Sequence, residues 1–243
     1  MQGDKERVDL DLAKRVYQLE TIQDVGLEIN SSHDTQTIVG VILQSVLGTL
    51  GSTRGAILLF DQDTGKLTVH TSKGLEGEQV TFKLTKGIVE WMVKTSLPFI
   101  LGELEDGKVK RFFERNKTKI KAVSAQVWTP LIAKETLLGV IVLGSKLGKK
   151  GYTPDDVSFL TTISGQAAQA LENARSYQLI DAARRELDKK LYEQSTLYEV
   201  SRSLIGTLDL DVLIYQTLLM SIGIIGCRAG SIMLQLTVLK SLI

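Results

Sequence analysis

Apolar residues recur at helical spacing at the start of the chain. A narrow apolar stripe with charged residues elsewhere predicts a long helix that can pair with a partner helix. The stripe consists of Val8, Leu12, Leu19, Ile22 and Ile29. Asp34 precedes a second periodic apolar segment and Gly51 follows it. These two residues predict the N-cap and the end of a second helix.

Short apolar or alternating runs follow, separated by turn residues. A continuous apolar run is typical of a buried strand, and alternation of apolar and polar residues is typical of a half-buried one. The predicted strands are residues 54–60, 66–71, 79–84, 125–132 and 138–145. The first two are joined by turn residues 61–65, and the last two by residues 133–137, so we expect two hairpins.

The stretch between the third and fourth predicted strands is less regular. Residues 87–95 predict a short helix, and an extended segment begins at Pro98. The highly charged residues 102–121 are expected to form a loop with a turn of helix. This is the long segment best suited to cover a free face of the predicted sheet.

The last strand is followed by a predicted long helix. Thr153 and Pro154 stand in the order of an N-cap and a first helical residue, and the helix is expected to continue to about residue 205. One heptad seam runs along its second half and contains Tyr177, Ile180, Leu187, Leu191, Tyr198 and Ile205. Such a seam favours a dimeric helical contact, and a solvated surface helix is the alternative.

The chain also resembles itself. Residues 17–59 align without a gap with residues 192–234, and the apolar pattern matches as well. Identical positions include Thr21 with Thr196, Asp34 with Asp209, Leu43 with Leu218, and Gly48, Gly51 and Gly55 with Gly223, Gly226 and Gly230. Glycines in register at a helix end and a strand start indicate equivalent turns of the backbone. We therefore predict a duplicated domain whose second copy is only begun.

Composition restricts the class of protein. With 29 basic and 28 acidic residues the formal net charge is +1, so no nucleic-acid or anionic-membrane partner is expected. The single cysteine, Cys227, and the two histidines, His33 and His70, argue against a disulfide framework and a zinc enzyme, and fit a cytoplasmic protein. Residues 1–15 lack a signal-peptide pattern, and the interrupted apolar residues 212–227 favour a buried helix over a membrane span.

Three stretches resemble the consensus of the GAF domain family. They are LTKGIVEWMVKTSLPFIL at 84–101, WTPLIAKETLLGVIVLGSK at 128–146, and YTPDDVSFLTTISGQAAQALENARSY at 152–177. The resemblance implies an α+β fold, in which an antiparallel sheet of five or six strands carries helices on one face and is flanked by long helices. It further implies a ligand pocket on the other face and a signalling role in which the flanking helices carry the output.

The resemblance and the internal repeat together suggest four segments. Residues 1–18 would be an N-terminal helical extension and residues 19–175 a complete GAF domain. Residues 176–192 would be a linker helix of coiled-coil type, and residues 193–243 the start of a second, truncated GAF domain.

The predicted roof and its neighbouring strands supply the candidate ligand-binding residues. They are Phe82, Trp91, Phe99, Arg111, Phe112, Gln126 and Trp128. Gln126 and Trp128 are expected on one face of a strand by parity, and Arg111 would anchor an anionic ligand. Packing in the core or roof is the alternative for the aromatic residues, and a solvated loop position is the alternative for Arg111.

The ligand itself stays unknown, although several classes lose support. Asn116 and Lys117 lack the downstream Phe and Asp-Glu of cyclic-nucleotide-binding GAF domains, and residues 19–175 contain no cysteine for a bilin or for sulfoxide reduction. No glycine-rich phosphate loop or catalytic triad is recognisable, so no catalytic residue and no enzyme activity is predicted. Asp155 and Asp156 are interpreted as first-turn acids favoured by the helix dipole.

Three functions follow from this pattern. The favoured one is a homodimeric sensory module that binds a small molecule and passes the change through its helices to an output domain beyond this chain. The alternative is a structural dimerisation module with a collapsed pocket and no ligand. A small-molecule enzyme is the third, and it lacks a visible reactive group.

Overall fold

The computed structural model describes residues 2–75, 80–149, 151–205 and 210–233. These residues fall into two compact units, Met1–Leu179 and Ile180–Ile243. The first unit is built on a six-stranded antiparallel sheet with the strand order β3-β2-β1-β6-β5-β4. The strands are β1 Gly55–Asp61, β2 Lys66–Lys73, β3 Thr81–Lys83, β4 Phe99–Ile100, β5 Val127–Ala133 and β6 Thr136–Leu143. The fold is therefore α+β, as the resemblance implies.

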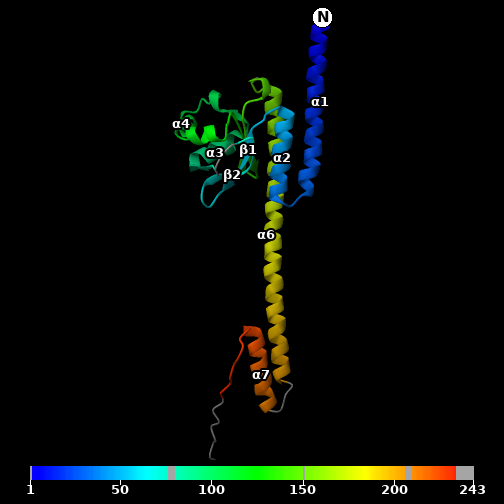
Figure 1. Cartoon of the computed structure of the whole chain (residues 1–243), viewed down its shortest axis with the longest axis vertical. Coiled ribbons are helices and arrows are strands. Elements are labelled where there is room, and N and C mark those ends of the chain that lie inside the picture. The colour runs from blue at the N-terminus through cyan, green and yellow to red at the C-terminus, as the bar shows by residue number, and fades with distance from the viewer. Residues whose placement is uncertain (1, 76–79, 150, 206–209, 234–243) are drawn as a thin grey trace, which may run out of the picture. The chain divides into compact units, whose positions relative to one another are not determined.

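Both faces of the central strands are buried, because helices cover both. Ile57 and Ile141 pack with α1 (Gln2–Ser31), α2 (Thr35–Leu50) and α6 (Pro154–Ile205) on one face. Leu58 and Val140, their neighbours along the strands, point to the opposite face. Figure 1 shows α2 and α6 against one side of the sheet and α3 and α4 on the other. Two covered faces explain the continuous apolar runs in these strands.

Local capping sets the predicted helix ends. The Asp34 side chain accepts a hydrogen bond from the backbone N–H of Thr37 at 2.8 Å and caps α2. Gly51 ends α2 in the left-handed conformation, with φ of 64°. At the start of α6, Thr153 Oγ1 accepts from the Asp156 N–H while the Asp156 carboxylate accepts from the Thr153 N–H, which forms a capping box.

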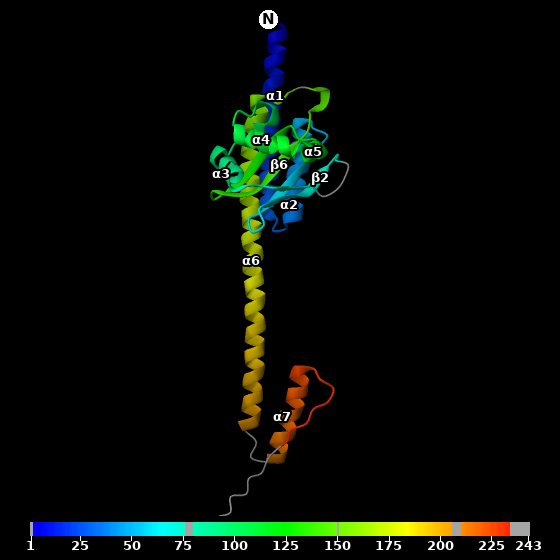
Figure 2. The ribbon, with the colours of Figure 1, turned by 90° about the vertical axis from the view of Figure 1, so that its left-hand side faces the viewer.

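The segment expected to be a loop is largely helical, so that prediction was wrong. After α3 (Lys86–Thr95) the chain forms a short 3₁₀ turn at Leu101–Glu103, then α4 (Gly107–Arg115) and α5 (Lys117–Ala122). Figure 2 shows these three α-helices in front of the sheet. The helical periodicity of apolar residues is weak in this segment, because α4 buries only Val109 and Phe113, one turn apart, and its other positions are largely charged.

The second unit contains the end of α6 and α7 (Leu210–Ile225), which Gly226 follows with φ of 72°. Both α2 and α7 have 16 residues, and they lie at corresponding positions of the internal repeat. The internal repeat aligns residues 55–59 of the first predicted strand with residues 230–234, so a second strand is expected from Gly230; the described residues 230–233 carry no strand. No helix among the described residues combines the length and hydropathy that a membrane crossing needs.

Candidate functional site

The sheet face beneath α3 and α4 is filled by four aromatic side chains, Phe82, Phe99, Phe113 and Trp128, here called the aromatic cluster. The Trp128 ring centroid lies 4.9 Å from that of Phe113 and 5.4 Å from that of Phe82, both in edge-on geometry. Phe99 stacks on Trp128 at 6.5 Å. Phe82 and Trp128 are fully buried. The cluster thus occupies the place where the resemblance implies a ligand pocket.

One polar atom in the aromatic cluster stands out. Trp128 Nε1 is buried and has no hydrogen-bond acceptor among the described residues. A buried indole N–H usually finds an acceptor, because leaving it unpaired costs free energy. The atom marks a point at which the packed face could receive a polar group.

A groove of about 540 Å³ lies over this cluster, between α3 and α4. We call it the α3–α4 groove. Aromatic and cationic side chains dominate its lining, chiefly Trp91, Lys94, Lys108, Arg111, Phe112 and Arg115. Its volume is within the range of about 300–1,000 Å³ that small-molecule sites occupy.

Helical spacing gathers the cations of this groove. Lys108, Arg111 and Arg115 recur three and four residues apart on α4, so they share one side of the helix. The Asp106 carboxylate caps α4 by accepting hydrogen bonds from the N–H groups of Lys108 and Val109, at 2.8 and 3.0 Å. Both hydrogen bonds lower the pKa of Asp106, and the bond from the Val109 N–H has the larger effect. The groove therefore presents a surface suited to an anion with a planar apolar part.

The seven predicted site residues separate into three groups. Trp91, Arg111 and Phe112 line the α3–α4 groove, whereas Phe82, Phe99 and Trp128 belong to the aromatic cluster. Trp91 touches the cluster edge-on at Phe99, with ring centroids 5.0 Å apart. Groove and cluster are thus in direct contact.

Gln126 stands apart from the other six. It is exposed and precedes β5, whose first residue is Val127, while Trp128 is fully buried. The two residues therefore do not line one pocket, although the Gln126 backbone still pairs with Leu143 at the end of β6. Gln126 instead borders another groove beside Arg54 and Lys121.

Sequence reasoning missed Lys94, Lys108 and Arg115. Lys108, Arg111 and Arg115 are spaced three and four residues apart in the sequence. This spacing places them on one side only if the segment is a helix. Because residues 102–121 were expected to form a loop with a turn of helix, the spacing did not lead to a prediction of a cationic surface. Lys94 reaches the groove from α3, a juxtaposition that depends on how the two helices pack.

Comparison with known proteins identifies the family. Residues 32–172, more than half of the chain, match the family model described as GAF domain. The chain belongs to the GAF domain family.

Individual similarities are distant. The nitrogen fixation protein VnfA of Azotobacter vinelandii is 23% identical over 146 residues, which make up 58% of this chain and 28% of that protein. The chain thus matches little more than a quarter of that relative's length. The GAF domain of a phosphoenolpyruvate-protein phosphotransferase from Coxiella burnetii has a TM-score of 0.52 and 14% identity, covering 68% of this chain and 98% of that one.

A GAF domain with a bound chromophore is similar in fold. The phycoerythrobilin-bound GAF domain of a cyanobacterial phytochrome has a TM-score of 0.52 at 15% identity, and the match covers 66% of this chain and 97% of that one. At these identities the structural likeness shows the GAF fold.

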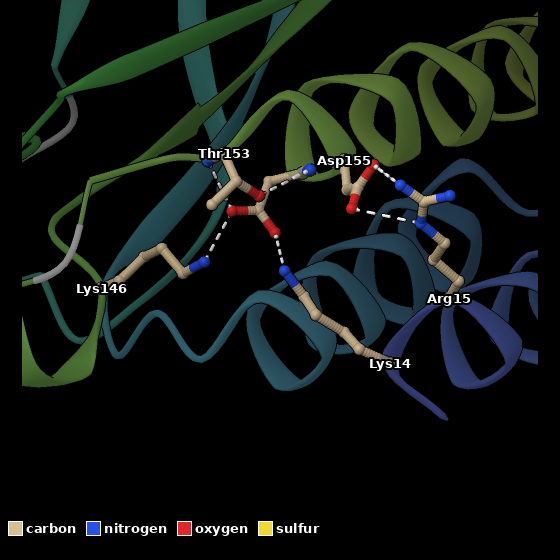
Figure 3. A network of polar contacts seen from close by, with 6 residues as sticks. Lys14, Arg15, Lys146, Thr153 and Asp155 are labelled. Carbon is tan, nitrogen blue, oxygen red and sulfur yellow. Dashed lines mark hydrogen bonds and ion pairs between the residues drawn. The ribbon is translucent and has the colours of Figure 1, made fainter. Parts of the chain in front are cut away.

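An ion-pair network around the buried Asp156 carboxylate joins α1 to the start of α6. We call it the α1–α6 clasp. Its members are Lys14, Arg15, Lys146, Thr153, Asp155 and Asp156, and Figure 3 labels all of them except Asp156. The Asp156 carboxylate is fully buried and accepts from Lys14 Nζ at 2.8 Å and Lys146 Nζ at 2.6 Å. Arg15 contacts Asp155 at 3.2 Å nearer the surface. The network connects α1, the segment that follows β6 and the start of α6 through the Asp156 carboxylate.

The ion pairs of the clasp change the pKa of Asp156. Burial raises the pKa of Asp156, but hydrogen bonds from Lys14, Lys146 and Thr153 outweigh it and lower the pKa to about 2. Asp156 is therefore more than the first-turn acid that the sequence predicts. Its partner Lys14 is far away in the chain, so the sequence offers no sign of the pairing.

Proposed function

We propose that this GAF domain is a sensory and regulatory module of signal transduction, which binds a small anionic molecule in the α3–α4 groove. Binding would shift the packing between α3, α4 and the sheet, and α1 and α6 would pass that change to an output domain beyond this chain. A bound molecule can do this only if it favours one arrangement of the helices over another.

The observation that carries the proposal is the lining of the α3–α4 groove. Trp91 and Phe112 offer aromatic surface, and Arg111 stands among three further cations. Of the two carboxylates there, Asp106 is occupied as a helix cap and Glu90 lies 3.8 Å from Lys86. The cations are thus left largely available for an anion.

Native mass spectrometry of the freshly purified full chain tests this function. We expect a retained small molecule, or stabilisation of the fold by an anionic aromatic compound in a thermal-shift screen. Arg111→Gln and Trp91→Ala should each weaken that effect, whereas Lys83→Gln, an exposed charge change outside the groove, should not. A retained molecule or thermal shift that is equal in all four proteins would contradict the proposal.

Dimerisation through the helices is part of the same proposal. The seam positions Leu187 and Leu191 of α6 are 57% and 55% exposed, and Leu12 and Leu19 of α1 are also exposed. Apolar side chains in heptad register on a long exposed helix favour a partner helix. A second copy of this chain would provide an identical seam.

Other parts of the proposal rest on the sequence. We propose a regulatory rather than enzymatic role, since no nucleophile and base are recognisable together, and a cytoplasmic location, consistent with the single cysteine, Cys227. We also propose that residues 193–243 begin a second GAF domain. The matching bounds of α2 and α7 and the left-handed Gly51 and Gly226 support this.

A structural dimerisation module is the second candidate, and the aromatic cluster favours it. Four packed aromatic side chains fill the sheet face where the resemblance implies a pocket. In that case the α3–α4 groove would be a surface depression without a ligand. No retained molecule and no thermal shift with any compound, in a protein that is still dimeric, would favour this candidate.

A further inference from the structure

A second and larger groove lies at the end of the sheet where β1 begins and β6 ends. Its volume is about 870 Å³, and α5 forms one of its walls. We call it the α5–β6 groove. Four cations line it, Arg54, Lys117, Lys121 and Lys146, and no aspartate or glutamate is among its described lining residues. Hydroxyl groups of Thr53, Ser124 and Ser145 border the same space.

Three of these cations are electrostatically uncompensated. Arg54, Lys117 and Lys121 form no ion pair within the described part of the chain. Lys117 and Lys121 lie one turn apart on α5, and Arg54 comes from the segment before β1. The Arg54 guanidinium donates to Ser124 Oγ at 3.4 Å, and the Arg54 carbonyl accepts from the Gly144 N–H at 2.9 Å. Arg54 is thus oriented at the groove edge. Converging cations that lack carboxylate partners raise the local positive potential and favour a multivalent anion.

The fourth cation connects the groove to the α1–α6 clasp. Lys146 lines the groove, yet its Nζ lies 2.6 Å from Asp156 and its side chain is only 14% exposed. Figure 3 shows Lys146 reaching toward the start of α6, on the side of the network opposite Lys14. An anion in the groove and the Asp156 carboxylate would therefore compete for the same ammonium group.

We propose that the α5–β6 groove binds a phosphorylated small molecule through Arg54, Lys117 and Lys121, and that the bound phosphate weakens the clasp by competing for Lys146. Phosphate oxygens need several charged donors at once, which arginine and lysine side chains supply. Ile120 and Leu147 offer apolar surface for the rest of such a molecule. A single hollow on a chain with a net charge of +1 suits a small soluble anion better than an extended polyanion.

Titration of the full chain with inorganic pyrophosphate tests binding. At constant ionic strength, Arg54→Gln and Lys121→Gln should each weaken pyrophosphate affinity roughly tenfold, as expected for the loss of one charged hydrogen-bonding partner. Lys108→Gln and Arg115→Gln remove the same charge from the α3–α4 groove and should leave the affinity within about twofold. Equal weakening in both pairs of variants, or no binding to the wild type, would overturn the proposal.

The two grooves can be distinguished in one set of proteins. Arg54→Gln and Lys121→Gln should keep any molecule retained by the α3–α4 groove, and Arg111→Gln should keep pyrophosphate binding. Vesicles of phosphatidylcholine and phosphatidic acid distinguish a lipid phosphate from a soluble one. Sedimentation with these vesicles in a protein that does not bind pyrophosphate would overturn the assignment to a soluble ligand.

Hydrogen exchange tests the link to the clasp. Pyrophosphate should raise amide exchange in residues 153–157 about twofold or more in the wild type, because the first turn of α6 loses part of its anchor. In Lys146→Gln the clasp already lacks this contact, so pyrophosphate should cause no further change. Exchange that stays constant in the wild type while pyrophosphate binds would refute the competition for Lys146.

Discussion

Asp156 is a buried, charged residue, and its ion pairs with Lys14 and Lys146 stabilise that charge. Its side chain is fully buried, while Lys14 and Lys146 are 37% and 14% exposed. A buried carboxylate is tolerated only when paired and hydrogen-bonded, and removing one partner leaves the other charges uncompensated. The start of α6 is therefore sensitive to changes at this one residue.

We predict that Asp156→Asn destabilises the fold by about 3–5 kcal/mol, because Lys146 would remain buried beside a neutral group. Chemical denaturation followed by circular dichroism measures this loss. Asp155→Asn is the matched control. Its partner Arg15 is 63% exposed, so the loss there should be below about 1 kcal/mol. Similar losses for the two variants would contradict the assigned role of Asp156.

The pKa of Asp156 also predicts a pH dependence. A carboxyl group whose pKa is lowered on folding stabilises the fold above its unfolded pKa, and this contribution is lost as pH falls through the folded value. Lowering the pKa from 3.8 to about 2 corresponds to about 2 kcal/mol of stability at neutral pH. As the pH falls from about 5 to 2, the wild type should therefore lose most of this contribution, and Asp156→Asn should not. Chemical denaturation of both proteins at a series of pH values measures whether the difference between their free energies of unfolding becomes smaller as the pH falls.

At the scale of single residues, prediction from sequence succeeded where the interaction is local. Asp34 caps the helix that begins next to it, so its neighbours in the chain define its role. Asp156 also fits a local role, as a first-turn acid, which concealed its ion pairs. Lys14 approaches it from α1, and no pattern in the sequence indicates such a contact.

Helix α2 ends at a glycine in the left-handed backbone conformation, which is unfavourable for residues that have a side chain. Gly51 has φ of 64°, and its N–H donates to the carbonyls of Leu47 and Gly48. Gly226 repeats this conformation after α7, with its N–H donating to the Ile222 carbonyl at 2.9 Å. The same stop signal at both sites supports the proposed duplication.

Two glycines of this helix should respond in opposite ways to the same substitution. Gly51→Ala should destabilise the fold by about 1 kcal/mol, because alanine resists the left-handed conformation. Gly48→Ala should stabilise it by about 0.5–1 kcal/mol, because Gly48 is inside the helix and a methyl group there meets no other atom. Thermal unfolding of the two variants measures the difference. Destabilisation by both would argue against a strained left-handed cap at Gly51.

Helix α4 marks the limit of element prediction. It has nine residues, and its hydrophobic signal consists mainly of Val109 and Phe113. A short helix with many charges has a weak intrinsic preference for helix, so packing against the sheet supplies most of its stability. The sequence therefore suggested a loop. The cations that α4 presents to the groove were missed for the same reason.

The molecule as a whole exposes apolar surface along its long helix. Of the proposed seam, Ile180, Leu187 and Tyr198 are 67%, 57% and 69% exposed. Contiguous exposed apolar surface on a helix marks an interaction site, and a heptad register favours a helical partner. A homodimer would bury this surface in both copies at once.

We predict that Leu187→Lys combined with Leu191→Lys converts a dimer into a monomer, because like charges would face each other across the seam. Light scattering coupled to size-exclusion chromatography measures the mass. Leu197→Lys is the control, since Leu197 is similarly exposed, at 61%, but lies off the seam. A wild-type monomer, or a double variant that stays dimeric, would count against the seam.

The resemblance of three stretches indicated the family, and short-range signals in the chain predicted the order of the main helices and strands and the ends of α2 and α6. Caps, glycine stops and hydrophobic periodicity act over a few residues, so they can be recognised before the chain folds. Only folding brings Lys14 and Lys146 to Asp156, separates Gln126 from Trp128, and collects cations into two grooves. These features depend on contacts between distant segments, whose geometry the packing of helices on the sheet decides.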